Sequence, residues 1–157
     1  KKIYHLNYIP FLFLLKLALI LSASETHLRN LINFSSEIHL TTNGQGEQYF
    51  LSNSYSGAQP NEVIVNGITV NYTGNKCYME EKINNVTLIF NEQISTCGYM
   101  FYYLTNIIEI DLSNFNTFEV INMTSMFSRC LNLEKINFGN INTSSVKYMN
   151  QFIFILY

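Results

Sequence analysis

Hydrophobic and polar positions in the second half of the chain repeat with a period of 26 residues. Met100–Ser125 aligns with Met126–Gln151 without a gap. A fixed period of this length is typical of a short structural unit that buries its apolar face against the next copy of itself. The positions that are identical in both copies are Met100/Met126, Phe101/Phe127, Asn106/Asn132, Ile110/Ile136, Asn114/Asn140, Asn116/Asn142, Thr117/Thr143, Val120/Val146 and Met123/Met149.

Two different spacings of apolar residues occur within each unit. Ile136 and Phe138 alternate with polar residues, which is typical of a β-strand, whereas Val120, Met123 and Phe127 are three and four residues apart, as on one face of a helix. We therefore expect each unit to consist of a strand, a polar turn and a short helical turn.

The region before the repeats, about residues 31–98, lacks the 26-residue period and contains short β-prone segments. Glu62–Val70 has two such segments joined by Asn-Gly, a strong signal for a β-hairpin because both turn residues must accept positive φ. This region predicts a small β-rich N-terminal cap (residues 25–98), which ends in a degenerate repeat. The other predicted strands are Glu37–Thr41, Gln48–Leu51 and Val86–Phe90, the last of which belongs to that degenerate repeat.

A specific motif in the second copy resembles a known family. Met126–Met149 reads Met-Phe-x-x-Cys-x-x-Leu-x-x-Ile-x-Phe-x-x-Ile-x-Thr-Ser-x-Val-x-x-Met. It resembles the BspA-like leucine-rich repeats of microbial surface proteins, in the 26-residue form also known as a domain of unknown function. The resemblance implies a β-rich, α/β leucine-rich-repeat-like solenoid over residues 99–157, with a ladder of parallel strands and short helical turns. It also implies display outside the cell and a role in adhesion or recognition.

The N-terminus has the features of a secretory signal peptide. Lys1 and Lys2 precede the apolar segment Ile9–Leu21, and the small residues Ala23 and Ser24 follow it. Because the apolar segment is shorter than the roughly 20 residues that a membrane span needs, we expect cleavage near residue 24 and an extracellular or cell-surface protein. The alternative for this segment is a buried or amphipathic helix. If the signal peptide is not cleaved, it is the part of the protein that we expect to contact a membrane.

Asn71 and Asn85 lie in Asn-x-Thr sequons outside the repeats and are the best candidates for N-glycosylation on a eukaryotic secretory route. A chain rich in Asn and Thr also produces such triplets by composition alone.

The three cysteines have no spacing typical of a metal site. Cys77 and Cys97 are candidates for a disulfide in an oxidising compartment. The alternative is that Cys97, which aligns with Met123, is a small core residue. Cys130 aligns with Leu104 and is predicted to lie in the core.

The sequence argues against catalysis, against a bound cofactor and against nucleic acid binding. The three histidines, His5, His27 and His39, lie in the first quarter of the chain, and no phosphate-binding loop or hydrolase motif is present. The net charge is −2, and the lysines and arginines form no basic stripe. A hydrolase would require a polar pocket in the cap that holds His39 with a carboxylate partner.

The strand positions that point outward from the repeats are the predicted ligand face. In parallel strands Glu109 would lie beside Lys135, and Asp111 beside Asn137. We therefore expect a non-catalytic binding or adhesion module for an extracellular protein or glycan. The alternative is a truncated structural remnant of a longer repeat protein, without a ligand of its own. It is suggested by the apolar residues from Phe152 onward, which lack a polar capping unit. Self-association through these apolar residues is a further expectation.

Overall fold

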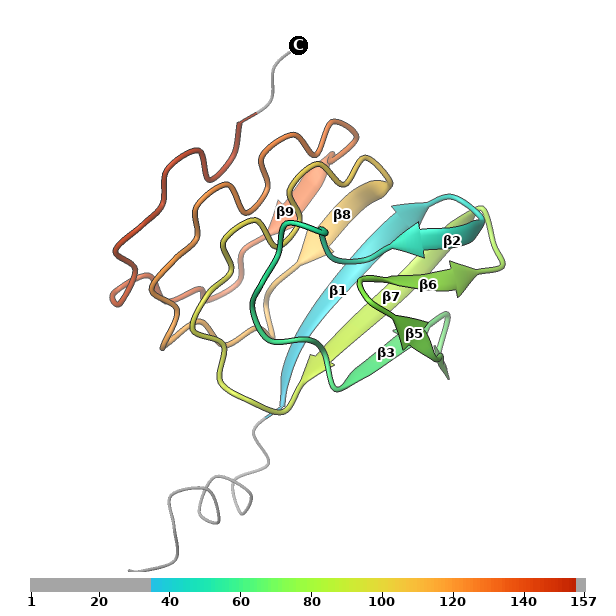
Figure 1. Ribbon diagram of the computed structural model, residues 1–157, viewed down its shortest axis with the longest axis horizontal. Coiled ribbons are helices and arrows are strands. Elements are labelled where there is room, and N and C mark those ends of the chain that lie inside the picture. The colour runs from blue at the N-terminus through green and yellow to red at the C-terminus, as the bar shows by residue number, and fades with distance from the viewer. Residues whose placement is uncertain (1–34, 155–157) are drawn as a thin grey trace, which may run out of the picture. The chain divides into compact units, whose positions relative to one another are not determined.

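The computed structural model describes residues 35–154, which form two β-sheets and no helix (Figure 1). The predicted signal segment, His5 and His27 lie outside the described residues. One sheet has six strands in the order β4-β3-β7-β1-β8-β9, and the other has three in the order β2-β6-β5. The strands are β1 (Ser36–Asn43), β2 (Gly46–Tyr49), β3 (Glu62–Val65), β4 (Ile68–Thr69), β5 (Tyr72–Thr73), β6 (Lys76–Met79), β7 (Ile83–Phe90), β8 (Ile107–Asp111) and β9 (Lys135–Asn137).

Strands β1 and β7 form the centre of the larger sheet. They pair antiparallel over eight residues each, from Ser36 opposite Phe90 to Asn43 opposite Ile83. Ile38 and Leu40 on β1 are buried, as is Leu88 on β7. The residues that alternate with them along each strand are more exposed. Burial of each of these large apolar side chains stabilises the fold by about 1.5–3 kcal/mol. The alternation therefore gives the sheet one apolar inner face and one polar outer face.

The predicted hairpin is confirmed. Val65 pairs with Ile68 across a two-residue turn, in which Asn66 has φ of 51° and Gly67 has φ of 82°. Two successive positive φ values define the type I′ turn that Asn-Gly favours. The predicted strands Glu37–Thr41 and Val86–Phe90 correspond to the greater parts of β1 and β7, whereas Gln48–Leu51 overlaps only the second half of β2.

A single hydrophobic core joins the cap to the repeats. The inner face of the larger sheet packs against the smaller sheet, where the Thr42 hydroxyl donates to the sulfur of Met79 at 3.2 Å. The same core includes Phe101 and Phe127 from the repeat units. Figure 1 shows the smaller sheet beside strands β1, β7 and β3, with the turns of the repeats on the other side of the domain.

The 26-residue period is visible in the hydrogen bonds between the units. Strands β8 and β9 are parallel, and Glu109 is paired with Lys135, which confirms the predicted neighbours. Isolated bridges join Thr96 to Asn122 and Asn122 to Tyr148, again with the spacing of one unit. Each unit therefore lies beside the next in the same register.

The predicted helical turns are wrong. The segment Cys97–Leu104 is a series of overlapping turns, in which Met100 N–H donates to Cys97 O at 3.1 Å and Tyr102 N–H to Tyr99 O at 3.1 Å. The alternate amides donate to the next unit instead, for example Phe101 N–H to Met126 O at 3.0 Å. An α-helix is excluded because these amides are not available to the carbonyl four residues earlier.

Left-handed residues recur in these turns at the period of the repeat. Tyr99, Ser125 and Gln151 have φ values of 60°, 52° and 52°. An α-helix does not tolerate such residues in its interior, so they end any helical path before one turn is complete. The apolar spacing of three and four residues is the same as on a helix, and for this reason the sequence pattern was misleading.

The predicted leucine-rich-repeat-like solenoid is also wrong. Strand β1 lies between β7 and β8 and is antiparallel to both, so the larger sheet is mixed, with one parallel pair. The strand Val86–Phe90 of the predicted degenerate repeat (Val86–Tyr99) forms no parallel pair with β8, because β1 lies between β7 and β8, although Thr96 of that repeat bridges in parallel to Asn122. The fold is a small β-rich domain in which the cap supplies the central strands.

Candidate functional site

A shallow hollow of about 350 Å³ lies on the polar outer face of the larger sheet. It crosses four neighbouring strands, β7, β1, β8 and β9. We call this surface the strand face. It is lined by His39, Leu40, Thr41, Asn85, Val86, Thr87, Glu109, Ile110, Asp111, Lys135 and Asn137.

The alternation of side chains along each strand produces this surface. On β1, Leu40 points into the core, whereas His39 and Thr41 on either side are half-exposed and point outward. On β8, Ile110 is buried and its neighbours Glu109 and Asp111 are half-exposed. All four residues of the ligand face predicted from the sequence, Glu109, Asp111, Lys135 and Asn137, line the same hollow.

Charges of both signs lie close together at the β8–β9 end of the strand face. Lys135 Nζ is 3.6 Å from Glu109 Oε2, and both side chains are largely exposed, so the pair contributes at most about 1 kcal/mol to stability. Asp111 Oδ1 accepts hydrogen bonds from Ser113 N–H at 2.8 Å and from Asn137 Nδ2 at 3.1 Å. Hydrogen bonding by Ser113, with smaller effects of Asn137 and His39, lowers the pKa of Asp111. The strand face therefore keeps an ionised carboxylate at neutral pH.

The part of the strand face that the sequence did not predict comes from the cap. His39 is paired directly with Thr87 on one side and with Asp111 on the other. The alternation in Glu37–Thr41 already placed His39 on the outer side of its strand. No local pattern showed that this strand would pair with β8, because the two are about 70 residues apart in the chain.

His39 has two polar partners in the strand face. Its Nδ1 is 3.0 Å from Thr87 Oγ1, and its Nε2 is 3.5 Å from Glu37 Oε2. This arrangement meets the condition for the hydrolase alternative, a polar pocket that holds His39 with a carboxylate. Thr87, however, is in β7, which is paired with β1 and β3 on its two sides, so the neighbouring strand amides are already hydrogen-bonded. These paired strand amides are therefore not available as backbone donors to an oxyanion beside His39.

The two predicted glycosylation sites differ in their surroundings. Asn85 is exposed and lines the strand face, and Thr87, the third residue of its sequon, bonds to His39. A glycan on Asn85 would therefore cover the surface that the ligand is expected to contact. Asn71 lines a second hollow of about 460 Å³, beside the exposed side chains of Ile68 and Tyr78.

The residues that the structure describes contain no cluster of three or more His, Cys, Asp or Glu side chains that could hold a metal ion. The disulfide predicted between Cys77 and Cys97 is not formed, because both are buried free thiols. Cys130 is also buried and free, as predicted for a core residue, and its thiol donates to Phe101 O at 2.9 Å. Burial raises the pKa of Cys77 and Cys130 to about 11, and it also raises the pKa of Cys97.

This state of the cysteines leads to a testable prediction. In the native protein at pH 8 we expect a thiol reagent such as DTNB to react slowly with all of them, because only the thiolate is nucleophilic and burial suppresses it. In guanidinium chloride without a reductant, three thiols per chain should react. A count of one thiol in denaturant would show instead that Cys77 and Cys97 are paired.

No helix in the described part of the chain has the length and apolar character needed to cross a membrane. No curated protein and no solved structure gives a significant match to the chain. A family model matches residues 72–154, which is more than half of the chain. The matched segment contains both repeat units and strands β7, β8 and β9 of the strand face, whereas His39 and Thr41 lie outside it. The chain therefore belongs to the family described as Mycoplasma protein of unknown function, DUF285.

Proposed function

We propose that this chain is a secreted or cell-surface binding module, without catalytic activity, that recognises an extracellular protein through the strand face. The observation that carries the proposal is the hollow itself. Its polar side chains come from four strands and from both halves of the domain, yet they point away from the core. Polar and charged groups gathered in one hollow can pair with complementary groups of a ligand.

The composition of the strand face favours a protein ligand over a glycan. None of its lining residues is a Trp, Tyr or Phe, so it lacks the large rings on which sugars commonly stack. Exposed tyrosines such as Tyr99 and Tyr103 lie in the turns of the repeats instead. Charges of both signs, from Lys135, Glu109 and Asp111, are suited to the polar and charged groups of a protein surface.

Secretion is the second part of the proposal. It is supported by the basic and apolar composition of residues 1–24 and by the exposed sequon at Asn71. If Asn85 is also glycosylated, its glycan would reduce access to the strand face. The alternative, a structural remnant of a longer repeat protein, predicts a folded domain with no ligand for this surface.

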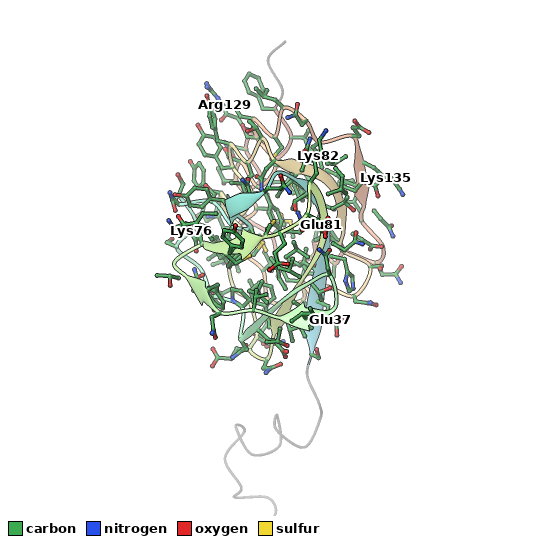
Figure 2. All side chains as sticks on the ribbon, turned by 90° about the vertical axis from the view of Figure 1, so that its right-hand side faces the viewer. Glu37, Lys76, Glu81, Lys82, Arg129 and Lys135 are labelled. Carbon is green, nitrogen blue, oxygen red and sulfur yellow. The ribbon has the colours of Figure 1, made fainter. Side chains whose placement is uncertain are left out.

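The test is a binding screen with matched lysine variants. The 157-residue chain would be displayed against an array of extracellular proteins and against an array of glycans, followed by Lys135→Ala and Lys76→Ala. Lys135 is exposed and Lys76 is half-exposed, and each forms an ion pair with a glutamate, Glu109 for Lys135 and Glu47 for Lys76. Figure 2 shows Lys135 and Lys76 on opposite sides of the domain, so Lys76→Ala is a control for general charge effects.

We expect a protein ligand whose affinity falls by about tenfold in Lys135→Ala and in His39→Ala, and is unchanged in Lys76→Ala. Equal losses in the two lysine variants would contradict a role of the strand face. A folded protein that binds nothing on either array would support the structural remnant. Hydrolysis of an ester probe that disappears in Thr87→Val would overturn the non-catalytic assignment.

A further inference from the structure

The apolar inner face of the larger sheet is partly uncovered at its β4 edge. Val65 on β3 is buried, whereas Ile68, which is paired directly with it on β4, is 69% exposed. Side chains that are directly opposite each other on paired strands lie on the same side of the sheet, so Ile68 continues the inner face. Val70 lies on the same side, because side chains alternate along a strand, and it is half-buried. The inner face therefore extends beyond the part that the smaller sheet covers.

A hollow of about 460 Å³ lies at this uncovered edge. We call it the edge hollow. It is bordered by Tyr78 of β6 in the smaller sheet, whose side chain is 65% exposed. Its volume is within the range of about 300–1,000 Å³ that is common for ligand sites. It is lined by Val65, Asn66, Ile68, Val70, Asn71, Tyr78, Glu80 and Glu81.

The edge hollow has a negative charge at one end. Glu80 and Glu81 are exposed and line it, and none of its described lining residues is a lysine or an arginine. The backbone at Glu81 is fixed next to the β3–β4 turn, because Asn84 Oδ1 accepts from Glu81 N–H at 3.3 Å and from Asn66 Nδ2 at 3.0 Å. The charge is therefore at the turn end of the hollow, and it is complementary to a basic side chain.

The backbone of β4 provides hydrogen-bonding groups beside the edge hollow. Strand β4 is an edge strand of the larger sheet, and none of the described strands is paired with its outer side. Val70 N–H donates to Val63 O at 2.9 Å, so this amide points toward β3. Backbone groups alternate in direction along a strand, so the N–H and C=O of Thr69 point away from β3. An extended segment can therefore pair with β4 as an additional strand.

We propose that the edge hollow binds an extended segment of a partner protein, in which a large apolar residue and a Lys or Arg are two positions apart. One residue of the segment pairs with Thr69, and the residues on either side of it point into the hollow. The apolar side chain packs against Val70 and Tyr78. The basic side chain lies next to Glu80 and Glu81. The strand face is on the outer side of the sheet, so this proposal does not depend on the proposed function.

The test is fluorescence anisotropy with labelled peptides of about eight residues, the length of a typical strand. Each Lys peptide contains Val, Ile, Leu or Phe two positions before or after a Lys, with Thr at all other positions. One matched set has Glu in place of Lys. A second set has N-methylated Thr, which removes backbone donors and retains every side chain. The 157-residue chain would be produced in a host without N-glycosylation, because a glycan on Asn71 would lie in the hollow.

Two double variants of the protein separate the edge hollow from general charge effects. Glu80→Gln with Glu81→Gln removes the two carboxylates of the hollow. Glu92→Gln with Glu134→Gln is the matched control, because it removes two exposed carboxylates that do not line the hollow. All four side chains are exposed, so both variants should fold, and circular dichroism would verify that the strands are retained.

We expect Lys peptides to bind to the wild-type chain, and the Glu peptides and the N-methylated peptides to bind at least about tenfold more weakly. Loss of the carboxylates at Glu80 and Glu81 should weaken binding of the Lys peptides by about tenfold, because two exposed ion pairs are lost. The control variant should bind them as the wild-type chain does. Absence of binding for every Lys peptide, equal binding by the two double variants, or equal binding of the N-methylated peptides would overturn the proposal.

Discussion

Replacement of Phe127 by alanine is expected to reduce the free energy of unfolding by about 3–5 kcal/mol, which is a large part of the stability of a domain of this size. Phe127 is fully buried and is the centre of an aromatic cluster that connects the repeats. Its ring lies 5.8 Å from that of Phe101, 6.2 Å from Phe138 and 5.1 Å from Phe152. Alanine would leave a cavity, and the rings of Phe101, Phe138 and Phe152 would each lose their contact with the Phe127 ring.

The measurement is denaturation by urea, followed by circular dichroism, with Phe118→Ala as the control. Phe118 is also a phenylalanine of the repeat region, but its side chain is 58% exposed. We expect Phe118→Ala to change stability by less than about 0.5 kcal/mol. Similar losses for both variants would mean that the aromatic cluster does not hold the units together.

A second large effect is expected for Asn84→Ala, which removes a fully buried polar side chain. Asn84 Nδ2 donates to Glu81 O at 2.7 Å and to Gly44 O at 3.2 Å, and Asn84 Oδ1 accepts from Asn66 Nδ2 at 3.0 Å. The side chain thus fixes the turn before β7 to the turn after β1. Its loss leaves several polar groups without partners, each at a cost of about 1–3 kcal/mol, so we expect a total loss of about 2–4 kcal/mol.

The matched control is Asn85→Ala, at the next residue of the same strand. Asn85 points to the other side of the sheet and is exposed. Its replacement should leave the midpoint of urea denaturation nearly unchanged. The role assigned to the Asn84 side chain would be wrong if the two variants had the same midpoint.

Local patterns were sufficient for several features of this domain. The 26-residue period set the register of β8 and β9, because the same residues recur at the same places and the strands must be in line for their apolar side chains to meet. The Asn-Gly turn specified the hairpin, because few other residue pairs accept two positive φ values. Strand alternation also identified four residues of the strand face.

The same patterns failed for the turns of the repeats. Apolar residues spaced by three and four fit a helix, but they also fit the overlapping turns around Tyr99 and Ser125. The difference depends on where the amides find acceptors, and those acceptors lie in the next unit. A local sequence window contains no information about this choice.

The sequence by itself therefore determined the repeat, the hairpin, the positions of β1 and β7 and the polar outer side of β8 and β9, but not the strands β5 and β6. Only the tertiary structure decided that β1 inserts between β7 and β8, and thus that His39 and Thr87 join Asp111 on one surface. The physical reason is that pairing between distant strands is governed by the fit of whole faces in a shared core, to which Ile38, Leu88 and Ile110 all contribute. Such a fit depends on the complete fold, whereas periodicity and turn chemistry depend on neighbours in the chain.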